Sequence, residues 1–157
     1  MKNSLVAYFS ATGVTASMAK SLADAIGADI YEIKPEQPYT AADLDWQQST
    51  SRSSVEMKNL SFRPVIVNDD AHIAQYDRIF LGFPIWWYIA PTIVNTFLEQ
   101  YDFSGKLIIP FATSGMSGMG QTNSHLQPSC PGATLCEGKR FDAAVSRDEL
   151  RRWADQF

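Results

Sequence analysis

Residues 5–15 read LVAYFSATGVT, an apolar run followed by a short loop of hydroxyl side chains around one glycine. The apolar run predicts a strand over residues 4–9. Apolar residues at helical spacing follow the loop and stop before Gly27, a residue type that ends helices. The stretch therefore predicts a strand, a loop and a helix in immediate succession.

The loop has the chemistry of a phosphate site. Successive backbone amides around Gly13, at the start of a helix, form a concave nest for an anion. The hydroxyls of Ser10, Thr12 and Thr15 add donors, and the loop contains no lysine or arginine. It therefore suits a phosphate monoester better than a triphosphate. A plain capped turn between strand and helix is the alternative that this loop alone leaves open.

Strand and helix patterns alternate along the rest of the chain. Further strands are expected at ADIYEI (28–33), DRIFLGFP (77–84), KLIIPFATSG (106–115, running into a loop) and 133–141. A polar excursion over residues 34–63 is expected to contain helices at 40–48 and 51–59. Further helices are expected after Pro91 and after Ser146, which forms a capping box with Glu149.

This alternation predicts an α/β fold with a central parallel sheet, in a single domain that spans residues 1–157. A chain of this length buries about 70% of its unfolded surface, so it needs no disulfide or metal to fold. Ligands of such sheets bind outside the carboxyl ends of the strands. That rule selects three loops, SATGVT (10–15), GFPIWWYIAP (82–91) and FATSGMSGMG (111–120).

The second loop carries the adjacent aromatic residues Trp86, Trp87 and Tyr88. Neighbouring side chains point in different directions, so one core layer cannot bury all three. We expect at least one exposed ring, on which a planar ligand can stack with about 0.5–1.5 kcal/mol beyond area burial. Core and rim packing is the alternative for these rings.

The third loop combines glycines with the hydroxyls of Ser114 and Ser117. Its glycines let the backbone approach a ligand closely. A flexible surface loop is the alternative when this segment is considered alone. Together, the anion nest, the aromatic wall and the donor-rich backbone indicate a nucleotide-like cofactor.

These motifs resemble those of short-chain flavodoxins, over nearly the whole chain. YFSATGVT resembles the phosphate-binding loop of that family, and GFPIWWYIAP and FATSGMSGMG resemble the two loops that border its flavin. The closing EGKRF and the final helix also match. The resemblance implies a flavodoxin-like three-layer α/β/α sandwich with a five-stranded parallel sheet in the order 2-1-3-4-5, and non-covalent FMN as the cofactor.

The resemblance also implies which residues bind the cofactor. The phosphate would be held by Ser10, Thr12, Gly13, Val14 and Thr15. The isoalloxazine would be bordered by Pro84, Ile85, Trp86, Trp87 and Tyr88. The pyrimidine edge would be reached by Thr113, Ser114, Gly115, Met116, Ser117 and Gly118. Met116 departs from the family pattern, which more often has glycine there.

Three functions follow from these residues. The leading expectation is an electron carrier that cycles FMN by one or two electrons between a reductase and an acceptor protein. The alternative is an FMN-dependent NAD(P)H:quinone or nitro-type oxidoreductase, which needs open space over the flavin. The remote alternative is a non-redox module that binds another phosphate. We identify no catalytic acid–base pair, so the flavin would supply the redox chemistry.

The composition limits the classes of partner that the protein is expected to bind. The net charge of −4, without a Lys/Arg-rich run, argues against binding nucleic acid or an anionic membrane and favours a protein partner with a basic docking face. No unbroken apolar window approaches about 18 residues, so no membrane span is expected. The chain enters a strand after residue 3 and has two cysteines, so we expect a cytoplasmic protein without a signal peptide.

Several remaining residues are given ordinary roles. His72 and His125 lie far apart and are not expected to bind a metal or act as bases. Arg52 and Glu56, four residues apart, are interpreted as a surface pair on a helix. Trp46 is interpreted as a core anchor of the excursion, with a place over the flavin or a substrate as the alternative.

Overall fold

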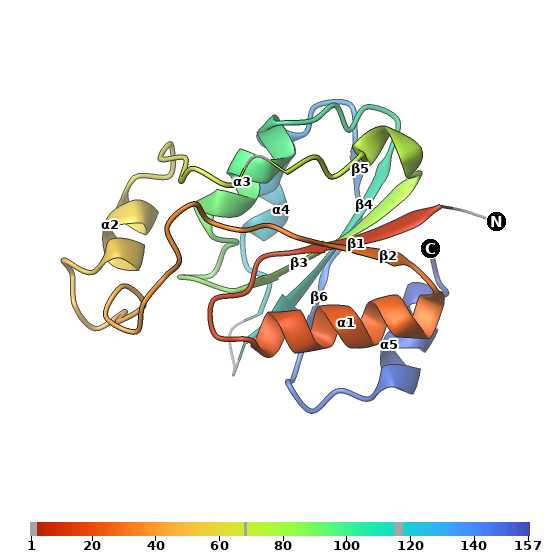
Figure 1. Cartoon of the computed structure of the whole chain (residues 1–157), viewed down its shortest axis with the longest axis horizontal. Coiled ribbons are helices and arrows are strands. Elements are labelled where there is room, and N and C mark those ends of the chain that lie inside the picture. Colours follow the sequence, from red (N-terminus) through yellow and green to blue (C-terminus); the bar gives the residue numbers. More distant parts are fainter. Residues whose placement is uncertain (1–2, 68, 115–117) are drawn as a thin grey trace.

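The structure is a computed structural model that describes residues 3–67, 69–114 and 118–157. Its centre is a parallel sheet in the order β2-β1-β3-β4-β5, with β6 also paired to β4 (Figure 1). The strands are β1 (Ser4–Tyr8), β2 (Asp29–Glu32), β3 (Arg78–Pro84), β4 (Leu107–Thr113), β5 (Thr134–Leu135) and β6 (Lys139–Phe141). The expected fold class and strand order are confirmed.

The last predicted strand is divided in two. β5 pairs with the start of β4, where Thr134 lies beside Leu107, and β6 pairs with its end, where Phe141 lies beside Thr113. Gly138 lies in the gap between them, and a Cβ atom there would approach the Pro110 carbonyl oxygen to 2.9 Å. The prediction of one continuous strand over residues 133–141 is wrong because the register against β4 changes by one residue between Ile108, paired with Leu135, and Phe111, paired with Lys139.

Two layers of helices cover the sheet (Figure 1). On one face lie α1 (Val14–Ile26) and α5 (Arg147–Ala154), and on the other lie α3 (Thr92–Glu99) and α4 (Thr122–Leu126). Alternate residues of β1 explain both layers, since Leu5 and Ala7 join one buried cluster and Val6 and Tyr8 join the other. A central strand buried on both faces reads as a continuous apolar run, as residues 4–9 do.

The ends of α1 and α5 follow the local sequence. α1 ends at Gly27, whose φ of 67° gives the left-handed conformation typical of a helix C-terminus. α5 begins after Ser146, whose side-chain oxygen accepts a hydrogen bond from the Glu149 amide at 3.1 Å. Both predicted ends are confirmed.

The excursion contains one of its two predicted helices. α2 (Arg52–Lys58) forms as expected, but residues 40–48 form turns. The Thr40 amide donates to the Asp43 carboxylate at 3.0 Å, and the Asp43 amide donates to the Thr40 hydroxyl at 3.1 Å. The prediction of a helix at 40–48 is wrong because these short polar side chains satisfy the backbone locally in a turn.

Three short helices have no counterpart in the sequence analysis. They are α4 and the 3₁₀ helices η1 (Ile73–Gln75) and η2 (Gln127–Ser129). None of the helices within the described ranges is long and apolar enough to cross a membrane.

Candidate functional site

The three loops selected from the sequence start at the same edge of the sheet. Tyr8 of β1 lies beside Gly82 of β3, and Pro84 of β3 lies beside Thr113 of β4. The Ile85 amide then donates to the Thr113 carbonyl at 3.2 Å, just past the paired strands. The carboxyl ends of β1, β3 and β4 therefore bring the loops together, as the parallel topology predicts (Figure 1).

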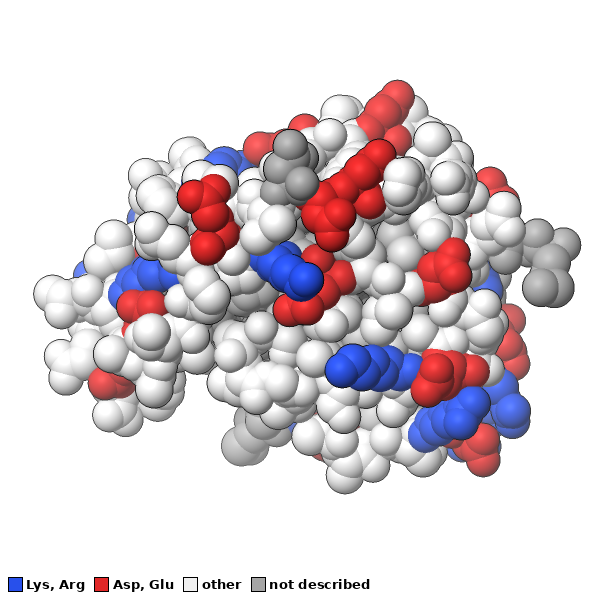
Figure 2. All heavy atoms as spheres, in the orientation of Figure 1, with Lys and Arg blue, Asp and Glu red and all other residues white. Residues whose placement is uncertain are grey.

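The β1–α1 loop leads into the first-turn amides of α1. Gly13 has a φ of 95°, and its amide donates to the Ser10 hydroxyl at 3.1 Å. The amides of Val14 and Thr15 lie in the first turn of α1, where no helical carbonyl is available to them. Thr12, Gly13 and Val14 are exposed. Among the described residues, Figure 2 shows mostly uncharged surface at the end of α1 where this loop lies. The amides of Val14 and Thr15 thus lie without a helical partner at the positive end of a helix dipole.

The Thr15 side chain has a structural partner. Its hydroxyl is buried and lies 2.7 Å from the Thr113 hydroxyl, so it ties the start of α1 to the end of β4. Its backbone amide still lies in the first helical turn. Of the hydroxyls assigned to the anion nest, that of Thr12 is exposed and that of Thr15 is engaged within the protein.

The β3–α3 loop is a tight aromatic turn. The Trp86 amide donates to the Ile89 carbonyl at 2.9 Å, and the Ile89 amide donates back to the Trp86 carbonyl at 3.3 Å. Trp87 and Tyr88, at the tip, have left-handed φ values of 50° and 68°. Such a conformation costs a non-glycine residue about 1–3 kcal/mol and is concentrated at functional sites.

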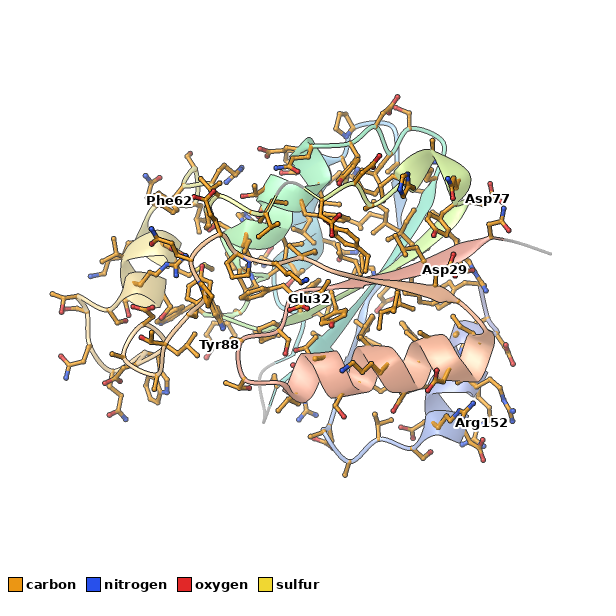
Figure 3. The ribbon with its side chains drawn as sticks, in the orientation of Figure 1. Asp29, Glu32, Phe62, Asp77, Tyr88 and Arg152 are labelled. Carbon is orange, nitrogen blue, oxygen red and sulfur yellow. The ribbon has the colours of Figure 1, made fainter. Side chains whose placement is uncertain are left out.

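This turn separates the three aromatic rings. Trp87 and Tyr88 are 44% and 65% exposed, and Figure 3 labels Tyr88 at the end of the sheet where β3 runs into the turn. Trp86 instead packs edge-on against Phe9 and Tyr39, with ring centroids 5.7 and 5.4 Å apart. The expectation of at least one exposed ring is confirmed.

The loop after β4 is held from two sides. The Ser114 carbonyl accepts two hydrogen bonds from the Arg140 guanidinium, at 3.1 and 2.7 Å. A Cβ atom on Gly120 would lie 2.3 Å from the Tyr88 carbonyl oxygen, so this loop packs closely on the aromatic turn. Gly118 is exposed. The predicted site residues Gly115, Met116 and Ser117 lie outside the described residues.

Arg140 was not identified as a site residue from the sequence. It lies in β6, and its guanidinium also pairs with Asp142 at 2.7 Å. The only sequence indication was its place in the EGKRF segment that resembles the flavodoxin pattern. Its contact with Ser114 depends on β6 lying beside the end of β4, which sequence spacing does not reveal.

A buried polar network joins the excursion to the aromatic turn. Glu56 is only 5% exposed, and it accepts hydrogen bonds from Arg52 Nε at 2.9 Å and from the Tyr39 hydroxyl. Burial, with the hydrogen bond to Glu56 as the second cause, raises the pKa of Tyr39. Since Tyr39 packs on Trp86, this network supports the turn. The expected pair of Arg52 and Glu56 does form on α2, but its interpretation as a surface pair is wrong because Glu56 is buried.

Trp46 is 69% exposed, so its interpretation as a core anchor is also wrong. Its side chain and that of Trp87 line a cavity of about 410 Å³ between the excursion and the aromatic turn. Neither histidine lines this cavity. His72 is exposed beside Asp70, and His125 lies in α4. Among residues 3–67, 69–114 and 118–157, no three His, Cys, Asp or Glu side chains are grouped to hold a metal.

The described residues fit a flat cofactor that ends in a phosphate. The amides around Gly13 can receive the phosphate, and the exposed rings of Trp87 and Tyr88 offer apolar faces at the same edge. Ser114 and Gly118 bring backbone groups to that edge from β4. Hydrogen-bond donors and planar surfaces therefore lie at the same edge of the sheet. The role of each residue in binding stays a prediction.

Comparisons with known proteins agree with this geometry. A family model described as Flavodoxin matches residues 3–157. A candidate flavoprotein of known structure from Bacteroides eggerthii is 46% identical, with a TM-score of 0.92, over 99% of this chain and 98% of that chain. A second one, from Bacteroides uniformis, is 47% identical, with a TM-score of 0.92, over 98% of each chain.

A more distant structure shares the fold. It is a flavoprotein in complex with FMN from Lactobacillus acidophilus, 22% identical to this chain, with a TM-score of 0.72 over 98% of this chain and 99% of that chain. No protein with a curated description matches the chain.

Proposed function

The chain belongs to the flavodoxin family, and from this premise we propose that it binds FMN at the three loops and carries electrons between a reductase and an acceptor protein. The observation that carries the proposal is the position of the first-turn amides of α1, just after Gly13, at the same edge of the sheet as the exposed rings of Trp87 and Tyr88. FMN, when bound, supplies the one- and two-electron redox chemistry.

The three loops would divide the binding between them. The phosphate would be held by Ser10, Thr12, Gly13, Val14 and Thr15, through backbone amides and the hydroxyls of Ser10 and Thr12, because the Thr15 hydroxyl is already bonded to Thr113. The ring system is bordered by Pro84, Ile85, Trp86, Trp87 and Tyr88. Its pyrimidine edge faces the loop that follows Thr113, which includes Ser114 and Gly118 among the described residues. Because the first loop has no cation, amide dipoles and hydroxyl groups would offset the phosphate charge.

The proposed partners are redox proteins with a basic docking face. The net charge of −4 supports this, because opposite charges steer two proteins together. Trp87 and Tyr88 are exposed, so a docked protein could come into contact with the turn that borders the cofactor.

An anaerobic titration tests the carrier function. The purified chain, saturated with FMN, is mixed with NADPH and followed by visible absorption. We expect the flavin bands to persist with NADPH alone and to bleach when an NADPH-dependent flavoprotein reductase is added. Fast bleaching by NADPH alone, with turnover on addition of a quinone, would show that the protein is an enzyme in its own right.

That enzyme, an FMN-dependent NAD(P)H:quinone or nitro-type oxidoreductase, is the second candidate function. The cavity between Trp46 and Trp87 favours it, because it offers a small flat molecule a place beside the aromatic turn. Steady oxidation of NADH or NADPH by the purified protein without any partner would support this candidate over the carrier.

A further inference from the structure

The cavity between the excursion and the aromatic turn has the size of a small-molecule site. Its volume is about 410 Å³, within the range of about 300–1,000 Å³ typical of ligand pockets. The lining includes Trp46, Met57 and Trp87 as apolar walls, with Gln47, Ser54 and Lys58 as polar groups. Figure 1 shows α2 and its flanking turns extending from the end of the sheet where β1, β3 and β4 finish.

The apolar walls are two indole rings that the core does not use. Trp46 and Trp87 are 69% and 44% exposed, and Trp87 has a left-handed φ of 50°. Two exposed tryptophans at one cavity leave a large apolar area in water. A flat ring system would cover that area and stack on the indoles.

The polar groups of the cavity favour an anion. Lys58 is the one charged residue in the lining, and no carboxylate of the described residues lies within 4.0 Å of its ammonium group. Its ammonium donates to the Ser49 carbonyl at 3.0 Å, and an ammonium group has three donors in all.

Ser54 adds a buried donor to the same cavity. Ser54 is only 5% exposed, and its hydroxyl accepts a hydrogen bond from the Ser51 hydroxyl at 2.9 Å. The proton of the Ser54 hydroxyl is thereby left to donate to a ligand.

We propose that this cavity binds a planar aromatic molecule with an anionic group, its ring against Trp46 and Trp87 and its anion toward Lys58 and Ser54. Because Trp87 also belongs to the turn that borders the proposed flavin, such a molecule lies where an electron acceptor or donor is needed. That redox role rests on the proposed function, whereas the binding does not.

The test uses the full chain freed of FMN and three probes of one shape, 2-naphthoate, 2-naphthamide and 2-naphthylmethylammonium. Calorimetry gives the affinities. We expect 2-naphthoate to bind about fivefold or more tightly than the amide, and the cation to bind least. Equal affinities, or tightest binding of the cation, would overturn the assignment of an anion site.

Variants locate the binding. Lys58→Gln should lower the affinity for 2-naphthoate about fivefold and leave the affinity for 2-naphthamide unchanged. Trp46→Ala should lower the affinity for both. Lys20→Gln, an exposed lysine on α1, is the matched control and should change neither. Since Trp46 is mostly exposed, its removal should leave the unfolding curve unchanged. Wild-type affinity of 2-naphthoate in Lys58→Gln would overturn the proposal.

A competition experiment separates this site from the flavin site. In protein saturated with FMN, 2-naphthoate should still bind, and its displacement by FMN would overturn the proposal of a separate cavity. If 2-naphthoate binds as expected while FMN does not bind at all, the proposed function fails and the aromatic-anion site stands.

Discussion

At the scale of single residues, two buried threonines tie the anion-binding loop to the sheet. The hydroxyls of Thr15 and Thr113 lie 2.7 Å apart, and both residues are less than 10% exposed. Removing one buried hydroxyl leaves the other without a partner, which costs more than removing both. This pair therefore sets the position of the first turn of α1 relative to the end of β4.

A double-mutant cycle measures that coupling. We expect Thr15→Val and Thr113→Val each to lower the free energy of unfolding by about 1–2 kcal/mol. The double variant should lose clearly less than the sum of the two, because it leaves no orphaned hydroxyl. Urea unfolding of all four proteins gives the comparison, and strictly additive losses would show that the two hydroxyls do not interact.

His125 makes stability depend on pH. Its Nε2 atom is buried without a partner among the described residues, and burial, followed by the charge of Arg63, lowers the pKa of His125 below 6.5. The unfolded state therefore binds a proton more readily than the folded state does. The stability that the neutral His125 imidazole contributes is therefore fully present above about pH 6.5 and is lost as the pH falls through its lowered pKa.

We expect His125→Gln to lose less stability than the wild type when the pH falls from 7 to about 5. The difference between the two proteins isolates this residue, because their carboxylates titrate alike. Urea unfolding at both pH values measures it. An equal or larger loss in the variant would contradict the burial of a neutral imidazole.

At the scale of elements, the excursion and the aromatic turn are joined by the Tyr39–Glu56–Arg52 network. The Arg52 guanidinium lies 3.8 Å from the centre of the Tyr39 ring, and its Nη1 donates to the Gln37 carbonyl at 2.6 Å. Trp86 packs on the other side of this network through Tyr39. A substitution that destabilises α2 should therefore also loosen the turn that borders the proposed flavin.

Tyr39→Phe tests that link. It removes the hydroxyl that donates to the buried Glu56 carboxylate, so we expect a loss of about 1–3 kcal/mol. Amide hydrogen exchange over residues 34–63 and 86–89 should become faster. The matched control is Tyr76→Phe, whose hydroxyl donates to Asp29 at the surface at 2.8 Å and should matter little. Unchanged exchange at 86–89 in Tyr39→Phe would show that the turn does not depend on the network.

The same elements show what the sequence could predict. Continuous apolar runs predict the strands β1, β3 and β4, and apolar residues at helical spacing predict the helices α1, α3 and α5. Residues 40–48 differ from the prediction because local side-chain hydrogen bonds decide their conformation. The division into β5 and β6 differs because the register against β4 changes by one residue. The spacing of apolar residues carries no information about either of these effects.

The site was predictable to the same degree. The three loops were found because parallel strands end at one edge of a sheet. The contact of Arg140 with Ser114, the burial of Glu56 and the exposure of Trp46 were not found, because each depends on how distant segments pack. Sequence spacing alone does not place β6 or the excursion against the loops.

At the scale of the whole molecule, two apolar cores hold a rigid sheet while its loops remain open at one edge. Each core lies between one face of the sheet and its helices, and the ring of Phe80 in one and that of Phe97 in the other are fully buried. The loops at the carboxyl edge carry exposed amides and rings that neither core requires. This division between a stable sheet and an exposed edge suits a protein that holds a redox cofactor and presents it to another molecule.

The central claim is that the β1–α1 loop receives the phosphate of FMN, and FMN titration of the cofactor-free chain tests it most directly. We expect tight binding by the wild type and at least about tenfold weaker binding by Gly13→Val, because a β-branched residue cannot keep the φ of 95°. Gly27→Val, at a φ of 67° on the far end of α1, should lose stability but keep its affinity for FMN. No FMN binding by the wild type, or full affinity in Gly13→Val, would contradict the account.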